Sequence, residues 1–224
     1  MDELNTIQKI AVMALPLMFA IILHEVAHGW VANKLGDRTA RDMGRLTLNP
    51  LPHIDIVGTI IMPLLCILFL KGIIFGYAKP VPINPYNFQN PKRGMALSSL
   101  AGPGINMAMA LLFAFILRIA IPPIKDMVPN HTWEWVVVPI ALMLGYGVLI
   151  NVVLAILNMI PIPPLDGSRL LYWILPNKIA AIYYRLEPFG MIILLALMIF
   201  GVLGDIIMPI IEPILMVLLG QTVL

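Results

Sequence analysis

Long apolar runs separated by short polar segments make up most of the chain. Five of these runs approach the ~20 residues that a helix needs to cross a bilayer, and a sixth is weaker. They cover residues 7–23, 56–75, 95–121, 135–160 and 188–203, with the weaker run at 206–219. The pattern predicts an all-α fold, a polytopic membrane protein with about four to six transmembrane helices.

The composition indicates the same class of protein. Of the 224 residues, 60% are hydrophobic and 12% are charged, and the mean hydropathy is +0.94. Soluble domains are about 45–50% apolar and about 25% charged. The polar segments 33–55 and 77–94 are too short to fold alone, so we expect residues 1–224 to form a single domain in the lipid bilayer. The net charge is +2, and the basic residues lie in short loops, as membrane topology requires. We therefore expect no nucleic-acid partner. The sequence leaves the oligomeric state open.

The second apolar run, residues 56–75, conflicts with the charge distribution if it crosses the membrane. The loop that follows the first run is basic, so the positive-inside bias puts this loop in the cytoplasm and the N-terminus outside. A full crossing of 56–75 would put the next three basic residues, which begin at Lys79, on the outer side. Either the run is re-entrant or the charge bias fails locally. Proline and glycine in this run allow a broken backbone, so we favour a short re-entrant or β-hairpin element.

Residues 79–85, which we call the strap, cannot form a regular helix. Their sequence, Lys-Pro-Val-Pro-Ile-Asn-Pro, contains three prolines, which fix an extended backbone and bias the residues before them in the same way. We expect an extended segment or a strand edge here.

The first apolar run leads into the motif His24-Glu25-Val26-Ala27-His28. Two histidines four residues apart lie on one face of a helix, so both can bind one Zn²⁺ while Glu25 acts on water as a general base. An ionisable residue at membrane depth costs about 2.5–3.5 kcal/mol on insertion scales, and binding of a dication would compensate this cost. The motif therefore predicts a zinc hydrolase inside a membrane.

A catalytic zinc site needs a third protein ligand. The position six residues after His28 is Lys34, and no glutamate lies between Glu25 and Glu134. The remaining candidates are Asp166, His53 and Asp55.

Asp166 follows a proline-rich break in the chain, where a run arriving from outside should reach the cytoplasmic half of the membrane. It could instead cap the helix that begins near Ser168. His53 could serve as an auxiliary or alternative ligand, bond to a ligand, or cap the segment 56–75, whereas Asp55 is better suited to capping that segment.

Three segments carry a family resemblance: the motif His24–His28, the segment Ala101-Gly102-Pro103 with Asn106, and residues 158–167. In this order they resemble the signature of the site-2 protease family of intramembrane zinc metalloproteases, and the resemblance covers nearly the whole chain. The chain has no PDZ or CBS segment, so it resembles a minimal form.

The resemblance implies a single transmembrane metalloprotease domain that binds one Zn²⁺ per chain. It assigns His24, His28 and Asp166 to the metal and Glu25 to catalysis. The residues expected at the substrate are Asn158, Asn106, Pro161 and Pro163. The family cleaves transmembrane segments of other proteins, which predicts a transmembrane protein substrate. We expect a multi-pass protein of the plasma or inner cell membrane, with its active site nearer the cytoplasmic side.

Two other functions fit parts of the sequence. A zinc carrier or sensor could use the same ligands for transit, although the outer half of the first helix offers no further acidic group. A membrane zinc protease of another family, acting on substrates outside the membrane, would use a different third ligand. Zinc transport without cleavage would favour the first, and zinc binding through a glutamate would favour the second.

Overall fold

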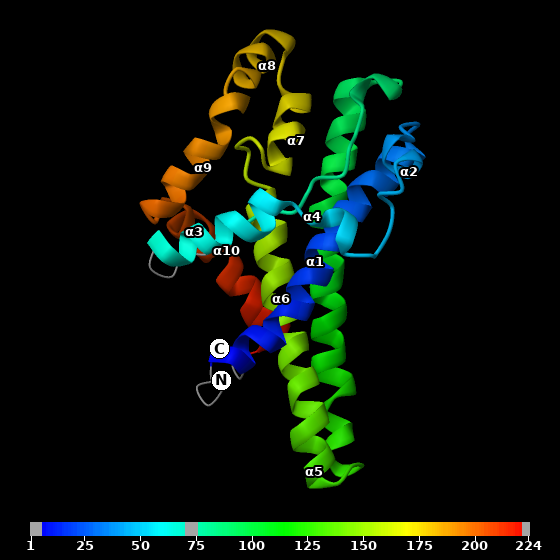
Figure 1. Ribbon diagram of the computed structural model, residues 1–224, viewed down its shortest axis with the longest axis vertical. Coiled ribbons are helices and arrows are strands. Elements are labelled where there is room, and N and C mark those ends of the chain that lie inside the picture. Colours follow the sequence, from blue (N-terminus) through cyan, green and yellow to red (C-terminus); the bar gives the residue numbers. More distant parts are fainter. Residues whose placement is uncertain (1–5, 70–75, 221–224) are drawn as a thin grey trace.

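The computed structural model describes residues 6–69 and 76–220, and these residues form helices joined by turns and one extended segment (Figure 1). No β-strand occurs in this part of the chain, which confirms the all-α prediction. Among the residues that the structure describes, five helical stretches are long and apolar enough to cross a membrane, within the predicted range of four to six. They are Ala11–Lys34, Pro91–Asp126, Asn130–Asn158, Asn177–Ile199 and Val202–Leu219.

Three long helices form the centre of the molecule: α1 (Thr6–Lys34), α4 (Pro91–Phe115) and α6 (Val138–Asn158). Each of the three packs against the other two. Small residues lie at these contacts: Ala110 is fully buried, and a side chain on Gly147 would collide with the Phe113 ring. Helices in membranes associate through such close van der Waals packing, because lipid provides little hydrophobic drive between them.

The last helix, α10 (Val202–Leu219), covers the other side of α6. Its Ile211, Leu215 and Leu219 are buried in one cluster with residues of α4 and α6. The remaining helices are shorter: α2 (Thr39–Asp42), α3 (Met62–Phe69), α5 (Asn130–Thr132), α7 (Asp166–Ile174), α8 (Asn177–Tyr184) and α9 (Gly190–Ile199). In Figure 1, α2 and α8 lie toward one end of the molecule and α5 lies at the opposite end.

The segment that begins at residue 56 is hydrogen-bonded near its start to Tyr77, which follows the apolar run. Asp55 caps its first turn by accepting a hydrogen bond from the Gly58 N–H, as predicted. The Gly58 carbonyl then accepts a hydrogen bond from the Tyr77 N–H at 3.0 Å, and the Thr59 hydroxyl donates to the Tyr77 carbonyl at 3.1 Å. Residues 58 and 77 are therefore neighbours, which favours a re-entrant course over a full crossing; residues 70–75 of this run lie outside the described part of the chain. The described part of it is helical, and no β-hairpin forms there.

This return resolves the conflict between the apolar run and the charges. Since residue 77 lies beside residue 58, the later basic residues stay on the same side as Arg41 and Arg45. Both polar segments then lie on one side, so the charges no longer conflict with the apolar run.

The re-entrant topology predicts the labelling of single cysteines. In a Cys66→Ala background, Arg41→Cys and Tyr86→Cys should react with a membrane-impermeant maleimide from one side of sealed vesicles. Met127→Cys, which is exposed near α5, should react from the other side. Labelling of Tyr86→Cys together with Met127→Cys, and not with Arg41→Cys, would show that the segment crosses.

Candidate metal centre

Three ionisable side chains meet between α1 and the first turn of α7. His24 Nε2 and His28 Nε2 lie 3.1 and 3.2 Å from Asp166 Oδ2. The two histidines come from one face of α1, and their rings are perpendicular with centroids 4.5 Å apart. Both histidines are buried at 7% exposure. Within the described residues, this is the group whose donor atoms lie close enough together to hold a metal ion.

The other nitrogen of each ring fixes the tautomer. His24 Nδ1 contacts Asn106 Oδ1, and His28 Nδ1 lies 2.7 Å from the Ser98 carbonyl oxygen. Both partners are acceptors, so each Nδ1 carries the proton and each Nε2 presents a lone pair. A metal-binding histidine is usually oriented in this way.

Asn106 determines the orientation of His24. Its Nδ2 donates to the Ala20 carbonyl at 3.2 Å and to Asn151 Oδ1 at 2.8 Å, so its Oδ1 must face the histidine. Asn106 is fully buried, and both ends of its amide are occupied. We predicted a substrate contact for Asn106; in the structure its amide bonds to His24, Ala20 and Asn151, and the substrate contact stays a prediction.

Asp166 completes a set of three acceptors that face one another. Its Oδ2 is buried without a hydrogen-bond partner, and an Nε2 atom that carries no proton offers it only a lone pair. Three acceptors within such distances repel one another unless a cation lies among them. Two imidazole nitrogens and a carboxylate oxygen are the donor set of a catalytic zinc site. The residues therefore fit zinc.

The alternative predicted for Asp166, a helix cap, is not what the structure shows. The cap position of α7 is Leu165, and no side chain bonds to the free N–H groups there. Asp166 is the first residue of the helix, and its carboxylate turns toward the two rings.

Gly102 of α4 makes room for the two histidine rings. A Cβ atom at this position would lie 2.5 Å from His28 Nε2 and 2.6 Å from His24 Cε1. Only glycine allows α4 to approach α1 this closely, which gives a physical reason for the glycine in the segment 101–106.

Glu25 lies between the two histidines in sequence and faces the strap. Its Oε2 accepts a hydrogen bond from the Val81 N–H at 2.8 Å. The strap is extended as far as residue 84, as predicted, and ends in a short 3₁₀ turn, Pro85–Asn87. One carboxylate oxygen of Glu25 is thus held by the backbone of the strap.

The break after α6 places Asp166. Gly167 lies against the Met159 carbonyl, and Gly190 lies against the Pro163 carbonyl, so neither glycine could carry a side chain there. Pro163 is buried, which argues against its predicted contact with substrate. Pro161 is exposed, and its carbonyl accepts a hydrogen bond from the Tyr183 hydroxyl.

Asn158 ends α6 just before this break. Its Nδ2 donates to the Leu154 carbonyl at 3.0 Å, and the side chain is only partly buried. Asn158 and Pro161 therefore remain accessible to a substrate.

His53 does not join the metal group. Its Nε2 lies 3.0 Å from the Thr47 carbonyl oxygen, and its Nδ1 is buried without a partner. Its backbone carbonyl accepts a hydrogen bond from the Lys79 N–H, so its place is beside the start of the strap. The prediction of His53 as a ligand gains no support.

Residues 12–201 match Peptidase family M50. The chain belongs to the site-2 protease family. This confirms the resemblance based on the three motifs, and Zn²⁺ is the metal that the family implies.

Curated relatives agree with this assignment. The chain is 33% identical over 185 residues to "Putative zinc metalloprotease YwhC" of Bacillus subtilis, covering 83% of this chain and 78% of that protein. It is 31% identical over 153 residues to "Putative zinc metalloprotease Rip2" of Mycolicibacterium smegmatis, covering 67% of this chain and 52% of that protein. The chain spans about half the length of this second relative. No solved structure matches the chain.

As a member of the site-2 protease family with five candidate membrane helices, the chain is a multi-pass membrane zinc metalloprotease. Sequence reasoning missed two parts of its metal centre. The contact with the Ser98 carbonyl could not be predicted from the sequence, because every residue type has a backbone carbonyl. Asn151 could have been noticed, since an amide within the apolar run 135–160 requires a partner.

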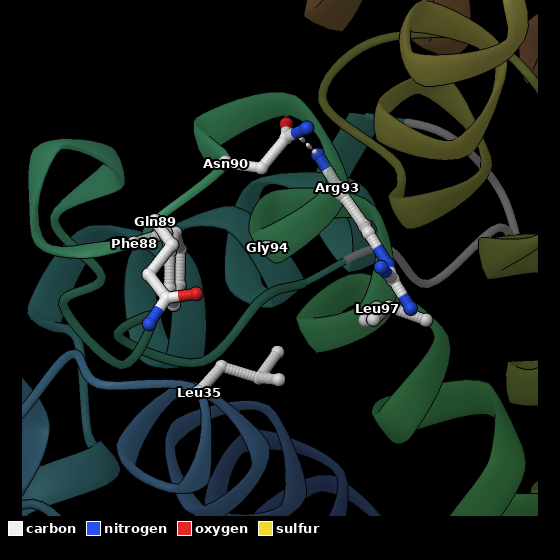
Figure 2. Close-up of a pocket in the computed structure, with 7 residues that line it drawn as sticks. All are labelled: Leu35, Phe88, Gln89, Asn90, Arg93, Gly94 and Leu97. Carbon is white, nitrogen blue, oxygen red and sulfur yellow. Dashed lines mark hydrogen bonds between the residues drawn. The ribbon is translucent and has the colours of Figure 1, made fainter.

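A separate pocket of about 240 Å³ lies where α1 ends and α4 begins (Figure 2). Asn90 and Arg93 lie side by side there, and Asn90 Oδ1 caps α4 by accepting the Arg93 N–H. The lining residues are Leu35, Phe88, Gln89, Asn90, Arg93, Gly94 and Leu97. None of the metal-binding side chains lines this pocket.

Asp37 anchors the far end of the strap to the loop after α1. Its buried carboxylate accepts hydrogen bonds from the Asn84 N–H and the Asn87 amide, each at 2.7 Å, and from Thr39. Burial alone would raise the pKa of Asp37, but these hydrogen bonds outweigh it and hold the pKa below the ordinary 3.8.

We predict that Gly102→Ala abolishes zinc binding, because a methyl group would displace both histidine rings. Gly104→Ala is the matched control, since a Cβ there meets nothing within 4 Å. Zinc content per purified chain, measured by inductively coupled plasma mass spectrometry, should be near zero for the first variant and about one for the second. Equal zinc content in both would contradict the packing described for Gly102.

We predict that Asp37→Asn destabilises the protein at neutral pH by about 1–3 kcal/mol, because an amide group would face the Asn84 N–H. The pKa of Asp37 is lower in the folded protein than in the unfolded chain, so the ionised carboxylate stabilises the fold at pH values above the unfolded-state pKa. This stabilisation is lost as the pH falls through the folded-state pKa. The difference in unfolding free energy between wild type and variant should therefore shrink below pH ~4. The exposed Asp42→Asn is the control and should change the unfolding free energy by less than about 0.5 kcal/mol. A constant difference from neutral to acid pH would contradict the assignment.

Proposed function

We propose that this protein hydrolyses peptide bonds in or near the transmembrane segments of membrane-tethered proteins. The main support is that the predicted ligands lie well before the end of α1, a helix long and apolar enough to cross a membrane. His24 and His28 lie ten and six residues before Lys34, the last residue of α1, which corresponds to about 15 and about 9 Å along the axis. A peptide bond that reaches these side chains must enter the hydrocarbon region.

The reaction assigns distinct tasks to the residues of the site. When bound, Zn²⁺ lowers the pKa of a water molecule to about 7 and polarises the scissile carbonyl. His24, His28 and Asp166 would hold it. Glu25 would accept the proton of the attacking water and deliver it to the leaving amine.

A substrate helix must unwind before it reacts, because its carbonyls are bonded within the helix. We propose that the extended strap, or the break that includes Asn158 and Pro161, pairs with the unwound substrate and replaces the lost hydrogen bonds. Both segments lie next to the metal group. The Val81 N–H of the strap donates a hydrogen bond to Glu25, and the break leads directly into Asp166.

We further propose that the site opens toward the cytoplasm. The basic residues of the loops 33–55 and 77–94 favour the cytoplasmic side for the C-terminal end of α1, and the histidines lie in the half of α1 nearest this end. Water then has a short path to the metal.

The test uses purified wild type, Glu25→Gln and Asp166→Asn with a panel of membrane-spanning peptides in liposomes. Glu25→Gln should keep its zinc and lose cleavage by about 10²–10⁴-fold, because the amide cannot accept the proton. Asp166→Asn should lose zinc and activity together.

A soluble peptide with the same scissile sequence is the substrate control, and wild type should cleave it far more slowly. Full cleavage by Glu25→Gln would contradict the assigned base. Preferential cleavage of the soluble peptide would contradict the intramembrane substrate, and zinc transport without cleavage would indicate a carrier.

A further inference from the structure

Arg45 is a buried cation outside the metal group. Its side chain is 7% exposed, although the arginines nearby at positions 38 and 41 are exposed. Burial of a guanidinium is costly; the contacts of Nη2 offset part of this cost, whereas Nε is buried without a partner. Arg45 Nη2 donates to the Lys79 carbonyl at 2.8 Å and approaches the Pro80 carbonyl at 3.4 Å. Both carbonyls belong to the start of the strap.

The Pro80 carbonyl and the Val81 N–H belong to the same planar peptide group. Arg45 contacts the oxygen of this group, and Glu25 Oε2 accepts a hydrogen bond from its nitrogen at 2.8 Å. A cation at the carbonyl end polarises the peptide and strengthens donation from the N–H end. One rigid unit therefore connects the guanidinium to the carboxylate of the predicted base.

The side chain of Val81 holds this peptide against α1. A Cβ at Gly29, the residue after His28, would lie 2.8 Å from Val81 Cγ1, so the valine occupies the space that the glycine leaves open. The Lys79 N–H bonds to the His53 carbonyl at 2.9 Å and limits movement along the strap. The peptide between residues 80 and 81 is thus fixed from both sides.

We infer that Arg45 is a positioning residue, which orients Glu25 for proton transfer through the peptide between Pro80 and Val81. The inference rests on the proposed function, because it assigns Glu25 the role of base. The Val81 N–H holds one carboxylate oxygen and so restricts the rotamers that the Glu25 side chain can adopt. Loss of this restraint should lower the rate of chemistry and leave substrate binding and zinc in place.

The direct test is Arg45→Met in the full chain, with Arg41→Met as the matched control. Arg41 is exposed in the same loop and carries the same charge. For Arg45→Met we expect kcat for a membrane-spanning peptide to fall about 10- to 100-fold, KM to change less than about threefold, and zinc to stay at one per chain. Arg45→Lys should recover part of the loss, since an ammonium can donate to one carbonyl. Unchanged kcat, or a rise in KM alone, would overturn the inference.

A second pair of variants tests the peptide itself if Arg45→Met fails to fold. Val81→Pro removes the N–H from a strap that already contains prolines on both sides, and Val81→Ala shortens the same side chain but keeps the N–H. The kcat of Val81→Pro should lie at least about tenfold below that of Val81→Ala, with equal zinc content. Equal kcat in the two variants would overturn the inference.

Hydrogen exchange separates failure of this inference from failure of the proposed function. The Val81 amide should exchange slowly in wild type and faster in Arg45→Met and in Glu25→Ala, but unchanged in Arg41→Met. If wild type cleaves no peptide, the proposed function fails, and the exchange pattern still decides whether Arg45 orients Glu25. Slow exchange in Arg45→Met would overturn the inference.

Discussion

Two imidazoles and a carboxylate lie together inside the helical bundle, and the cost of removing them from water constrains the structure around them. Each would be unfavourable alone at this depth. Together, with both Nδ1 atoms donating to acceptors on α4, they present three acceptor atoms to one small region. Such an arrangement is stable with a cation among the acceptors, so metal binding and the packing of α1, α4 and α7 depend on one another.

The close packing around the three side chains explains why glycines lie at the contacts between these helices. Gly102 lets α4 approach the rings, and Gly167 lets the start of α7 reach the chain that leaves α6. The amides of Asn106 and Asn151 then continue the hydrogen-bonding from His24 into α6, so that no buried polar group of this pathway faces lipid. The metal centre is in this sense a product of helix packing.

The sequence predicts a structural feature well where the residue type itself restricts the backbone or the spacing alone determines the helix face. The spacing of His24 and His28 determined a shared helix face, and the prolines of the strap excluded a helix. Other features depend on three-dimensional contacts that spacing does not encode. The buried hydrogen bond between Asn106 and His24 joins residues 82 positions apart, and the bond between residues 58 and 77 likewise depends on the fold.

The central claim is that His24, His28 and Asp166 together bind zinc. X-ray absorption spectroscopy of the zinc-loaded protein tests it most directly. We expect a first shell of nitrogen and oxygen at about 2.0–2.2 Å, with the outer-shell scattering of two imidazoles and no sulfur at about 2.3 Å. We also expect that Asp166→Asn changes this spectrum or removes the zinc. A different number of imidazoles, or a spectrum that Asp166→Asn leaves unchanged, would contradict the claim.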